Sequence, residues 1–485
     1  MVSYYAFLCV IAASLSALSL GLDVGMISST LVQPRFLAYF KNPSSSQTGG
    51  IVAAFSAGAT FGAFGCSYIG DPIGRVWALR IGAAIAVVGC ALQAGSVHIA
   101  MLIVGRLING FGAGQLTAVF PIYASEVAPP KVRGAFGGFQ MLMIEAAIFV
   151  ATATGYAFGI YYDDDLQWRG PLAVQAIPLV LLIPVTFFLP ETPRWLISKG
   201  KEDQAMKVLC RLHPSPDGNT FAHMEFEEIK SHILAEKASF KPSWKEIASK
   251  SSWRRRVLLV SALQFFAQAT GVNCVQYYAA SIYTQLGFDH SESLLINLLY
   301  GAFGLIFAIG WVLVLDRFPR VKLLIFSTLF MALALLVQSI LSAVYANKSD
   351  PNPNALRAQV SMFFIFQLGF IAVGMLSWLI PPEMCPMVIR AKVNSVSVSV
   401  NNIAGLVVSE ISPVALGAIG FKFFYVYVAC NLAGCVFYYF CLPETSNISL
   451  EDMDARFGDQ IDIQGEYIKD QGNQADVTHD ENAKV

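Results

Sequence analysis

Twelve long apolar segments constrain the fold of this 485-residue chain more than any other feature. A helix needs about 20 mostly apolar residues to cross the hydrocarbon core of a bilayer. We place the segments at 5–27, 50–69, 77–95, 98–123, 135–160, 172–189, 257–283, 293–315, 323–345, 360–381, 393–419 and 421–442. Only 13% of the residues are charged, which argues against a soluble domain. The sequence therefore predicts an all-α membrane protein with twelve transmembrane helices.

Two polar stretches interrupt the apolar pattern and divide the chain. We expect an N-terminal six-helix bundle at 1–190, a cytoplasmic helical linker at 191–255, a C-terminal six-helix bundle at 256–442 and an acidic cytoplasmic tail at 443–485. Within the linker, residues 201–212 and 225–237 have helical patterns. The tail carries eleven acidic against three basic residues from Glu444 onward, and its last twenty residues are expected to be disordered.

The distribution of lysine and arginine predicts the orientation in the membrane. The even-numbered short connections hold eight basic residues against six on the opposite side, and the linker region adds thirteen more up to Arg256. Cytoplasmic loops carry the excess of basic residues in membrane proteins. We therefore expect a multi-pass protein with both termini in the cytoplasm. We also expect it to be a monomer in the lipid bilayer, in the plasma membrane.

Several other classes of protein are disfavoured by composition. The formal net charge of −1 argues against a nucleic-acid partner, which would require a basic excess. The nine cysteines lack the paired short spacing of a metal site, so no metal is expected. The chain has no cofactor motif and no polar segment large enough to hold a catalytic cleft, and an enzyme is therefore not expected.

Short motifs recur between the two halves at a nearly constant offset. Glu126, Pro129 and Arg133 repeat 257 residues later, and the sequence Leu-Pro-Glu-Thr at 189–192 repeats after 253 residues. Asp71 and Arg75 are matched after 245 residues. Two related bundles that face a site at the membrane midplane are the plan of secondary transporters.

The repeated charges lie at the predicted cytoplasmic ends of helices. We expect a network that biases which side of the protein is open, with pairs between helices and across the halves. Arg133 and Arg390 are expected to act in this switching rather than in solute binding. The alternative is that the basic residues only anchor the topology. The proposed members are Asp71, Arg75, Glu126, Arg133, Glu191, Arg194, Asp316, Arg320, Glu383, Arg390 and Glu444.

The same motifs, taken in order, resemble the sugar porter family of the major facilitator superfamily, in particular fungal sugar–proton symporters. The resemblance runs from about residue 21 to 453. It is carried by Gly21, Leu22, Asp23, Val24 and Gly25, by Gly105, Arg106, Gly110, Gly112 and Gly114, by the block from Pro121 through Arg133 to Gln140, and by Pro-Glu-Thr at 190–192 and 443–445. The glycine motifs are weak singly and specific together.

The resemblance implies a major facilitator fold and a secondary active transporter. Such a protein would import a sugar, a polyol or a related polyhydroxyl solute by proton symport, with the proton as coupling ion and no cofactor. The resemblance places Asp23 opposite Arg106 near the pocket, as the coupling pair; the alternative is a static ion pair. Glu145 is a second candidate for coupling that the family pattern does not explain. Facilitative uniport, export of a metabolite and nutrient sensing remain alternative functions.

Six residues are expected to bind the solute: Gln140, Gln268, Asn273, Tyr277, Trp378 and Asn401. Amides donate and accept hydrogen bonds, and aromatic faces pack on the carbon side of a sugar ring. The alternative for each is hydrogen bonding or packing between helices. Most of them belong to the C-terminal half, so we expect the pocket mainly there. Ala267, Asn402 and Gly405 stand where the family usually has Gln, Trp and Asn, and they predict an altered pocket.

Overall fold

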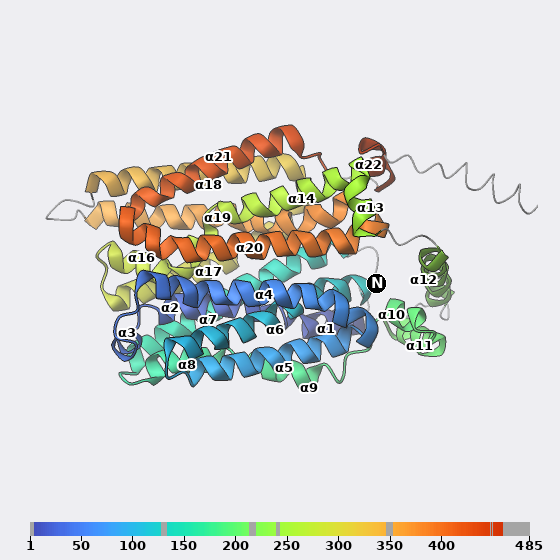
Figure 1. Ribbon diagram of the computed structural model, residues 1–485, viewed down its shortest axis with the longest axis horizontal. Coiled ribbons are helices and arrows are strands. Elements are labelled where there is room, and N and C mark those ends of the chain that lie inside the picture. The colour runs from blue at the N-terminus through green and yellow to red at the C-terminus, as the bar shows by residue number, and fades with distance from the viewer. Residues whose placement is uncertain are drawn as a thin grey trace, which may run out of the picture.

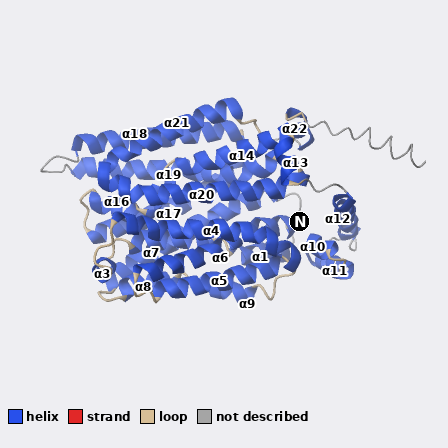
Figure 2. Cartoon of the chain, viewed as in Figure 1, coloured by secondary structure: helices blue, strands red, loops and turns tan. Residues whose placement is uncertain are grey.

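The computed structural model describes residues 4–127, 133–212, 220–238, 243–345, 353–446, 448 and 450–458. Figure 2 shows that the ordered elements in these ranges are all helices. Inside a bilayer no water satisfies the peptide groups, so a spanning segment must make its backbone hydrogen bonds internally. Helix formation is therefore the direct consequence of the apolar segments.

The N-terminal half forms one bundle, and short helices follow it. The bundle helices are α1 (Tyr4–Ser14), α2 (Leu18–Thr30), α3 (Pro34–Tyr39), α4 (Ser45–Ile73), α5 (Arg75–Ala94), α6 (Ile99–Val127), α7 (Arg133–Tyr161), α8 (Leu166–Val174) and α9 (Ile177–Val185). The connecting helices are α10 (Pro193–Ser198), α11 (Glu202–Leu212), α12 (Thr220–Ala238) and α13 (Trp244–Ser249). Helix α11 lies where a helix was predicted over 201–212, and α12 begins five residues before the predicted start at 225.

The C-terminal half forms the second bundle. Its helices are α14 (Ser251–Ala269), α15 (Val272–Tyr277), α16 (Ala279–Gln285), α17 (His290–Val314), the 3₁₀ turn η2 (Leu315–Arg317), α18 (Arg320–Tyr345), α19 (Pro353–Met384), α20 (Met387–Ile419), the 3₁₀ turn η3 (Gly420–Phe423), α21 (Phe424–Cys441) and α22 (Leu450–Arg456). Several crossings are made by two consecutive helices, for example α14 followed by α15.

The helices account for twelve membrane crossings. Eleven stretches in the described residues are long and apolar enough to span a bilayer. The last of them, Lys392–Cys441, covers most of α20 and all of α21 and therefore crosses twice. The predicted fold class, an all-α protein with two six-helix bundles, is confirmed. The tail beyond residue 458 lies outside the described residues.

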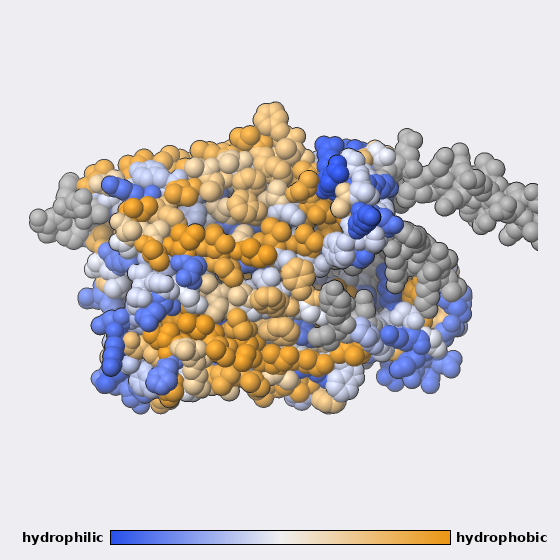
Figure 3. Space-filling model, in the orientation of Figure 1, coloured by the Kyte–Doolittle hydropathy of each residue, from blue (hydrophilic) through white to orange (hydrophobic). Residues whose placement is uncertain are grey.

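The two bundles lie side by side with their helices along the long axis of the molecule (Figure 1). Helices α10 to α13 and α22 gather at one end, which we call the linker end, and α3 and α16 lie toward the opposite or far end. Figure 3 shows apolar residues over the flank of both bundles and polar residues at the ends. Large apolar side chains such as Phe188 and Phe440 are exposed and would face lipid.

Small residues allow the closest helix contacts within the N-terminal bundle. A Cβ atom at Gly110 of α6 would lie 2.1 Å from the carbonyl oxygen of Phe55 on α4, and one at Gly114 would lie 2.1 Å from that of Ala59. Membrane helices lack a hydrophobic driving force between them and depend on such close packing. The glycines of the fourth span are therefore packing residues.

The two bundles touch through α7 and α17 and through α4 and α20. Near the far end, Asn297 Nδ2 on α17 donates to Ser29 Oγ on α2 over 3.3 Å. A Cβ at Gly159 of α7 would lie 2.5 Å from Leu294 Cδ1 on α17. The far end is thus closed by direct contact between the halves.

The segment after the last span returns to the C-terminal bundle. Arg256 at the start of α14 is fully buried and pairs with Asp454 of α22 at 2.8 Å. Its guanidinium carbon also lies 4.6 Å from the centre of the Phe457 ring. Helix α22 is therefore held against the linker end by charge and by aromatic packing.

Replacing Gly110 or Gly114 by valine should destabilise the protein by about 1–3 kcal/mol, because the added carbons enter space occupied by the α4 backbone. Thermal unfolding of the purified protein in lipid nanodiscs measures the effect. Gly310→Val is the matched control, since no atom lies within 4 Å of a Cβ at that position. Equal melting temperatures for the three variants would contradict this account of the packing.

Candidate functional site

A cavity lies between the two bundles. The space in it for the centres of water molecules is about 120 Å³, several times what one water needs. The N-terminal half contributes mostly apolar residues: Leu20, Val24, Phe55, Ala59, Ala113, Met141, Ile144 and Ile148, with Ser56, Thr117 and Glu145 as the polar ones. The C-terminal half contributes the polar or aromatic residues Gln268, Asn273, Gln276, Tyr277, Ser377, Trp378, Asn401 and Asn402, with Ala267, Val272, Phe370, Gly374, Val398 and Gly405. The polar wall of the cavity therefore belongs mainly to the C-terminal bundle.

Of the six predicted binding residues, five line this cavity and Gln140 does not appear in its wall. Gln140 is buried on α7 beside the wall residue Met141, and its Nε2 has no hydrogen-bond partner among the described residues. Gln276 and Ser377 also line the cavity and were not predicted. Gln276 is three residues after Asn273, one helical turn along the same helix, and that spacing was available in the sequence.

A chain of amide hydrogen bonds holds the polar wall in place. Gln268 Nε2 donates to Asn401 Oδ1 over 3.0 Å, and Asn401 Nδ2 donates to Gln264 Oε1 over 2.7 Å. Gln264 Nε2 in turn donates to the carbonyl oxygen of Ser377 over 2.8 Å. Gln268 Oε1 has no partner in the described part of the chain. The arrangement orients the amide of Gln268 and leaves its Oε1 free to accept a hydrogen bond from a solute.

Gln264 was missed by the sequence analysis, although it lies four residues before Gln268 on the same face of α14.

The structure explains why a glycine stands at position 405. A Cβ there would lie 2.8 Å from Asn273 Nδ2, so the glycine makes room for that amide. Ala267, the position without the usual glutamine, lines the cavity directly.

Asp23 and Arg106 form a buried ion pair next to the cavity. Asp23 Oδ1 and Oδ2 lie 3.1 and 3.0 Å from Arg106 Nη1 and Nη2, and both side chains are inaccessible to solvent. Gln175 Nε2 donates to Asp23 Oδ1 over 3.3 Å, and Arg106 Nε donates to the carbonyl of Ile51. The guanidinium lies 5.6 Å from the ring centre of Phe55, which lines the cavity. The pair therefore sits directly behind the cavity wall.

A second acid, Glu145, lines the cavity itself. It is completely buried on α7, and Gln367 Nε2 of α19 donates to both of its carboxyl oxygens over 3.2 Å. Its hydrogen-bond donor therefore comes from the opposite bundle.

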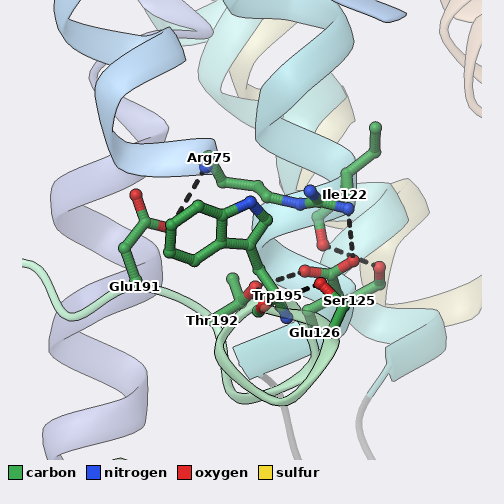
Figure 4. A network of polar contacts seen from close by, with 8 residues as sticks. Arg75, Ile122, Ser125, Glu126, Glu191, Thr192 and Trp195 are labelled. Carbon is green, nitrogen blue, oxygen red and sulfur yellow. Dashed lines mark hydrogen bonds and ion pairs between the residues drawn. The ribbon is translucent and has the colours of Figure 1, made fainter. Parts of the chain in front are cut away.

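At the linker end, the N-terminal bundle holds a compact polar network (Figure 4). The backbone N–H groups of Arg75 and Val76, at the start of α5, donate to Glu191 over 3.1 and 3.0 Å. Arg75 Nη2 pairs with Glu126 at 3.2 Å, and Thr192 Oγ1 donates to the other oxygen of Glu126 over 2.5 Å. The network ties the ends of α5 and α6 to the segment after α9.

The C-terminal bundle contains the same network at the repeated positions. The N–H groups of Arg320 and Val321 donate to Glu444 over 2.8 and 3.1 Å. Arg320 Nη2 lies 3.7 Å from Glu383, and Thr445 Oγ1 donates to Glu383 over 2.6 Å. The internal repeat of the sequence is thus a repeat of a hydrogen-bonded structure.

The contacts given above join residues within one half. The expected pairs across the halves remain a prediction. Arg390 Nε and Nη2 both donate to the carbonyl oxygen of Cys385 over 3.1 Å. The side chains of Asp71, Arg133 and Asp316 lie outside the described residues, and Arg194 lies on α10.

Glu191 receives its hydrogen bonds at the N-terminus of α5, where a helix favours negative charge. Burial nevertheless raises the pKa of this carboxyl above its ordinary value, against the lowering effect of the backbone donors of Val76 and Arg75. The effect of burial on the pKa of Glu191 is therefore larger than the effect of its backbone hydrogen bonds.

The comparisons with known proteins agree with this architecture. The family described as "Sugar (and other) transporter" matches residues 8–457. The MFS-type transporter criB of Aspergillus cristatus is 33% identical over 94% of both chains. The galactose-proton symporter of Escherichia coli K12 is 30% identical over 92% of this chain and 93% of its own. The inward-open xylose transporter XylE of E. coli superposes with a TM-score of 0.76 at 24% identity, covering 93% of this chain and all of that one.

The family match and these relatives identify a multi-pass membrane transporter rather than an enzyme. The chain belongs to the sugar transporter family of the major facilitator superfamily.

We expect Glu191→Ala to lower the stability of the protein by about 1–3 kcal/mol, because two N–H groups at the start of α5 lose their acceptor. Thermal unfolding of the purified protein measures this. Glu202→Ala is the control: Glu202 pairs with Lys230 at 2.8 Å, but both side chains are more than a third exposed, and such pairs contribute about 0–1 kcal/mol. An equal loss of stability in Glu202→Ala would contradict the expectation that the buried Glu191 contributes more to stability than the exposed Glu202.

Proposed function

We propose that this chain imports a sugar, a polyol or a related polyhydroxyl solute together with protons, by alternating access of the central cavity. The observation that carries the proposal is the amide wall of the C-terminal bundle, with Gln268 held by Asn401 and its Oε1 unused. A hydroxylated solute loses water on entry and needs donors and acceptors in replacement. The opposite apolar wall suits the carbon face of a ring.

We propose the proton as coupling ion, because Asp23 is an ionisable group at membrane depth next to the cavity wall. Protonation of Asp23 would weaken its two bonds to Arg106 and permit the loaded carrier to change conformation. Glu145 is the second candidate for coupling. Relatives named as proton symporters, such as the galactose-proton symporter, support this coupling.

We further propose a monomer in the plasma membrane, with both termini and α10 to α13 in the cytoplasm. The linker end carries the basic residues that support this orientation, among them Arg254, Arg255 and Arg256. The repeated networks around Glu126 and Glu383 lie at the same end. They would keep each half rigid while the halves move relative to each other.

Uptake of a panel of labelled sugars and polyols into cells that lack their own carriers tests the proposal. Concentrative uptake of at least one solute, lost when the proton gradient is collapsed, is expected. Uptake that only equilibrates the solute would indicate facilitative uniport. If no member of the panel enters, import of polyhydroxyl solutes is contradicted and export becomes the function to test.

Gln268→Ala should weaken binding of the transported solute about 5- to 150-fold, because a buried hydrogen bond worth about 1–3 kcal/mol is lost. Titration calorimetry on the purified protein gives the affinity. Gln115→Ala is a matched control, since Gln115 is a buried amide on α6 that donates to the Ala78 carbonyl and does not line the cavity. Unchanged affinity in Gln268→Ala would place the solute elsewhere.

Asp23→Asn should abolish accumulation against a gradient and retain counterflow of labelled solute, because asparagine keeps the shape of aspartate and cannot carry the proton. Asp163→Asn makes the same chemical change at an acid that is 92% exposed and pairs with Arg35, and it should accumulate solute normally. An Asp23→Asn carrier that still concentrates solute would exclude Asp23 as the coupling site and leave Glu145 as the candidate.

A further inference from the structure

Glu145 occupies an unusual position between the two bundles. It lies on α7 of the N-terminal half, is fully buried and lines the cavity. A Cβ at Gly304 on α17 would lie 2.4 Å from Glu145 Oε2, so the carboxyl group packs directly against the opposite bundle. A glycine at this position leaves the space that the carboxyl group fills.

The donor to Glu145 is an amide that makes two further hydrogen bonds. Gln367 Oε1 accepts from the hydroxyl of Tyr300 on α17 and from Gln276 Nε2, the latter over 3.3 Å. In this arrangement the oxygen of Gln367 faces Tyr300 and Gln276, and its Nε2 faces Glu145. Gln367 thus makes hydrogen bonds on both sides of its amide.

Gln276 connects this cluster to the solute cavity. It lines the cavity together with Asn273 and Gln268 and at the same time donates to Gln367. A continuous path of hydrogen bonds therefore leads from the cavity wall, through Gln367, to a carboxyl group on the other bundle.

We infer that Gln276, Gln367 and Glu145 form a relay that ties solute binding in the cavity to the contact between the two bundles, with Gln367 as the positioning residue. The inference rests on the proposed function where it names a hydroxylated solute. A solute oxygen that accepts from Gln276 and draws its amide nitrogen toward the cavity removes one of the two donors to Gln367 Oε1. Tyr300 alone then orients Gln367, its donation to Glu145 weakens, and the bundles separate more readily.

Separation of the bundles can be measured without any solute. Leu294 at the far end is 1% exposed and packs against Gly159 of α7. A cysteine in its place reacts with a water-soluble maleimide only while the far end is open, so the labelling rate reports the open population. Peptide mass spectrometry on the full-length protein in nanodiscs distinguishes this site from the nine native cysteines.

In the Leu294→Cys background, Gln367→Ala and Glu145→Ala should raise the labelling rate about five- to tenfold, the effect of losing one such hydrogen bond. Glu145→Gln retains an acceptor for Gln367 and should stay within about twofold of the parent. Tyr300→Phe removes one orienting donor and should raise the rate about two- to fivefold, which keeps the inference testable where an alanine variant does not fold.

Gln338→Ala is the control, since Gln338 is a buried amide on α18, which packs on α19 and α21 of the same bundle. It should label at the parental rate. Parental labelling in Gln367→Ala and Tyr300→Phe, or an equal increase in Gln338→Ala, would overturn the relay.

Adding a transported solute separates this inference from the proposed function. With D-glucose and xylitol as probes, the parent should change its labelling rate and Gln276→Ala should not. A parent whose labelling rate changes with neither probe would count against the proposed solute class. The labelling rates without solute would still test the relay. An equal response in the parent and in Gln276→Ala would overturn the relay.

Discussion

The absence of water from the hydrocarbon core is the constraint on which the rest of this structure depends. It requires each crossing to be a helix, and it favours charged side chains at membrane depth that are paired inside the protein. Asp23 is satisfied by Arg106 and Gln175, and the amides of Gln264, Gln268 and Asn401 form a chain. Gln268 and Asn401 line the cavity between the two bundles, where a solute can use them.

The two halves repeat one structural device at the linker end. In each half, a glutamate after the sixth membrane crossing, Glu191 or Glu444, accepts hydrogen bonds from the first N–H groups of another helix. The arginine at the start of that helix pairs with a second glutamate. These bonds join helices within a half, and in the proposed function they would keep each bundle rigid while the halves move. The cavity and Glu145 lie at the contact between the bundles.

Much of the candidate site was accessible from the sequence because residue type, depth and family motif agreed. Gln268, Asn273, Tyr277, Trp378 and Asn401 line the cavity as a group. Gln264 and Gln276 were missed although each lies one helical turn from a predicted residue. Whether such a glutamine faces the cavity, a backbone carbonyl or a neighbouring amide depends on how its helix is rotated relative to the other helices. Hydrophobic periodicity does not define this rotation in an apolar segment that has few polar residues.

The sequence by itself determined the number of crossings, the two-bundle plan and the pairing of motifs between halves, because each of these follows from hydrophobic length and from repeated residues. Only the tertiary structure decided which charges meet. Glu126 could have paired across the halves, and it instead joins Arg75 and Thr192 of its own half. Glu145 has no neighbour in sequence that explains it, and its partners Gln367 and Gly304 lie on helices of the other bundle. Contacts between distant segments depend on how the bundles pack, and no local pattern records that packing.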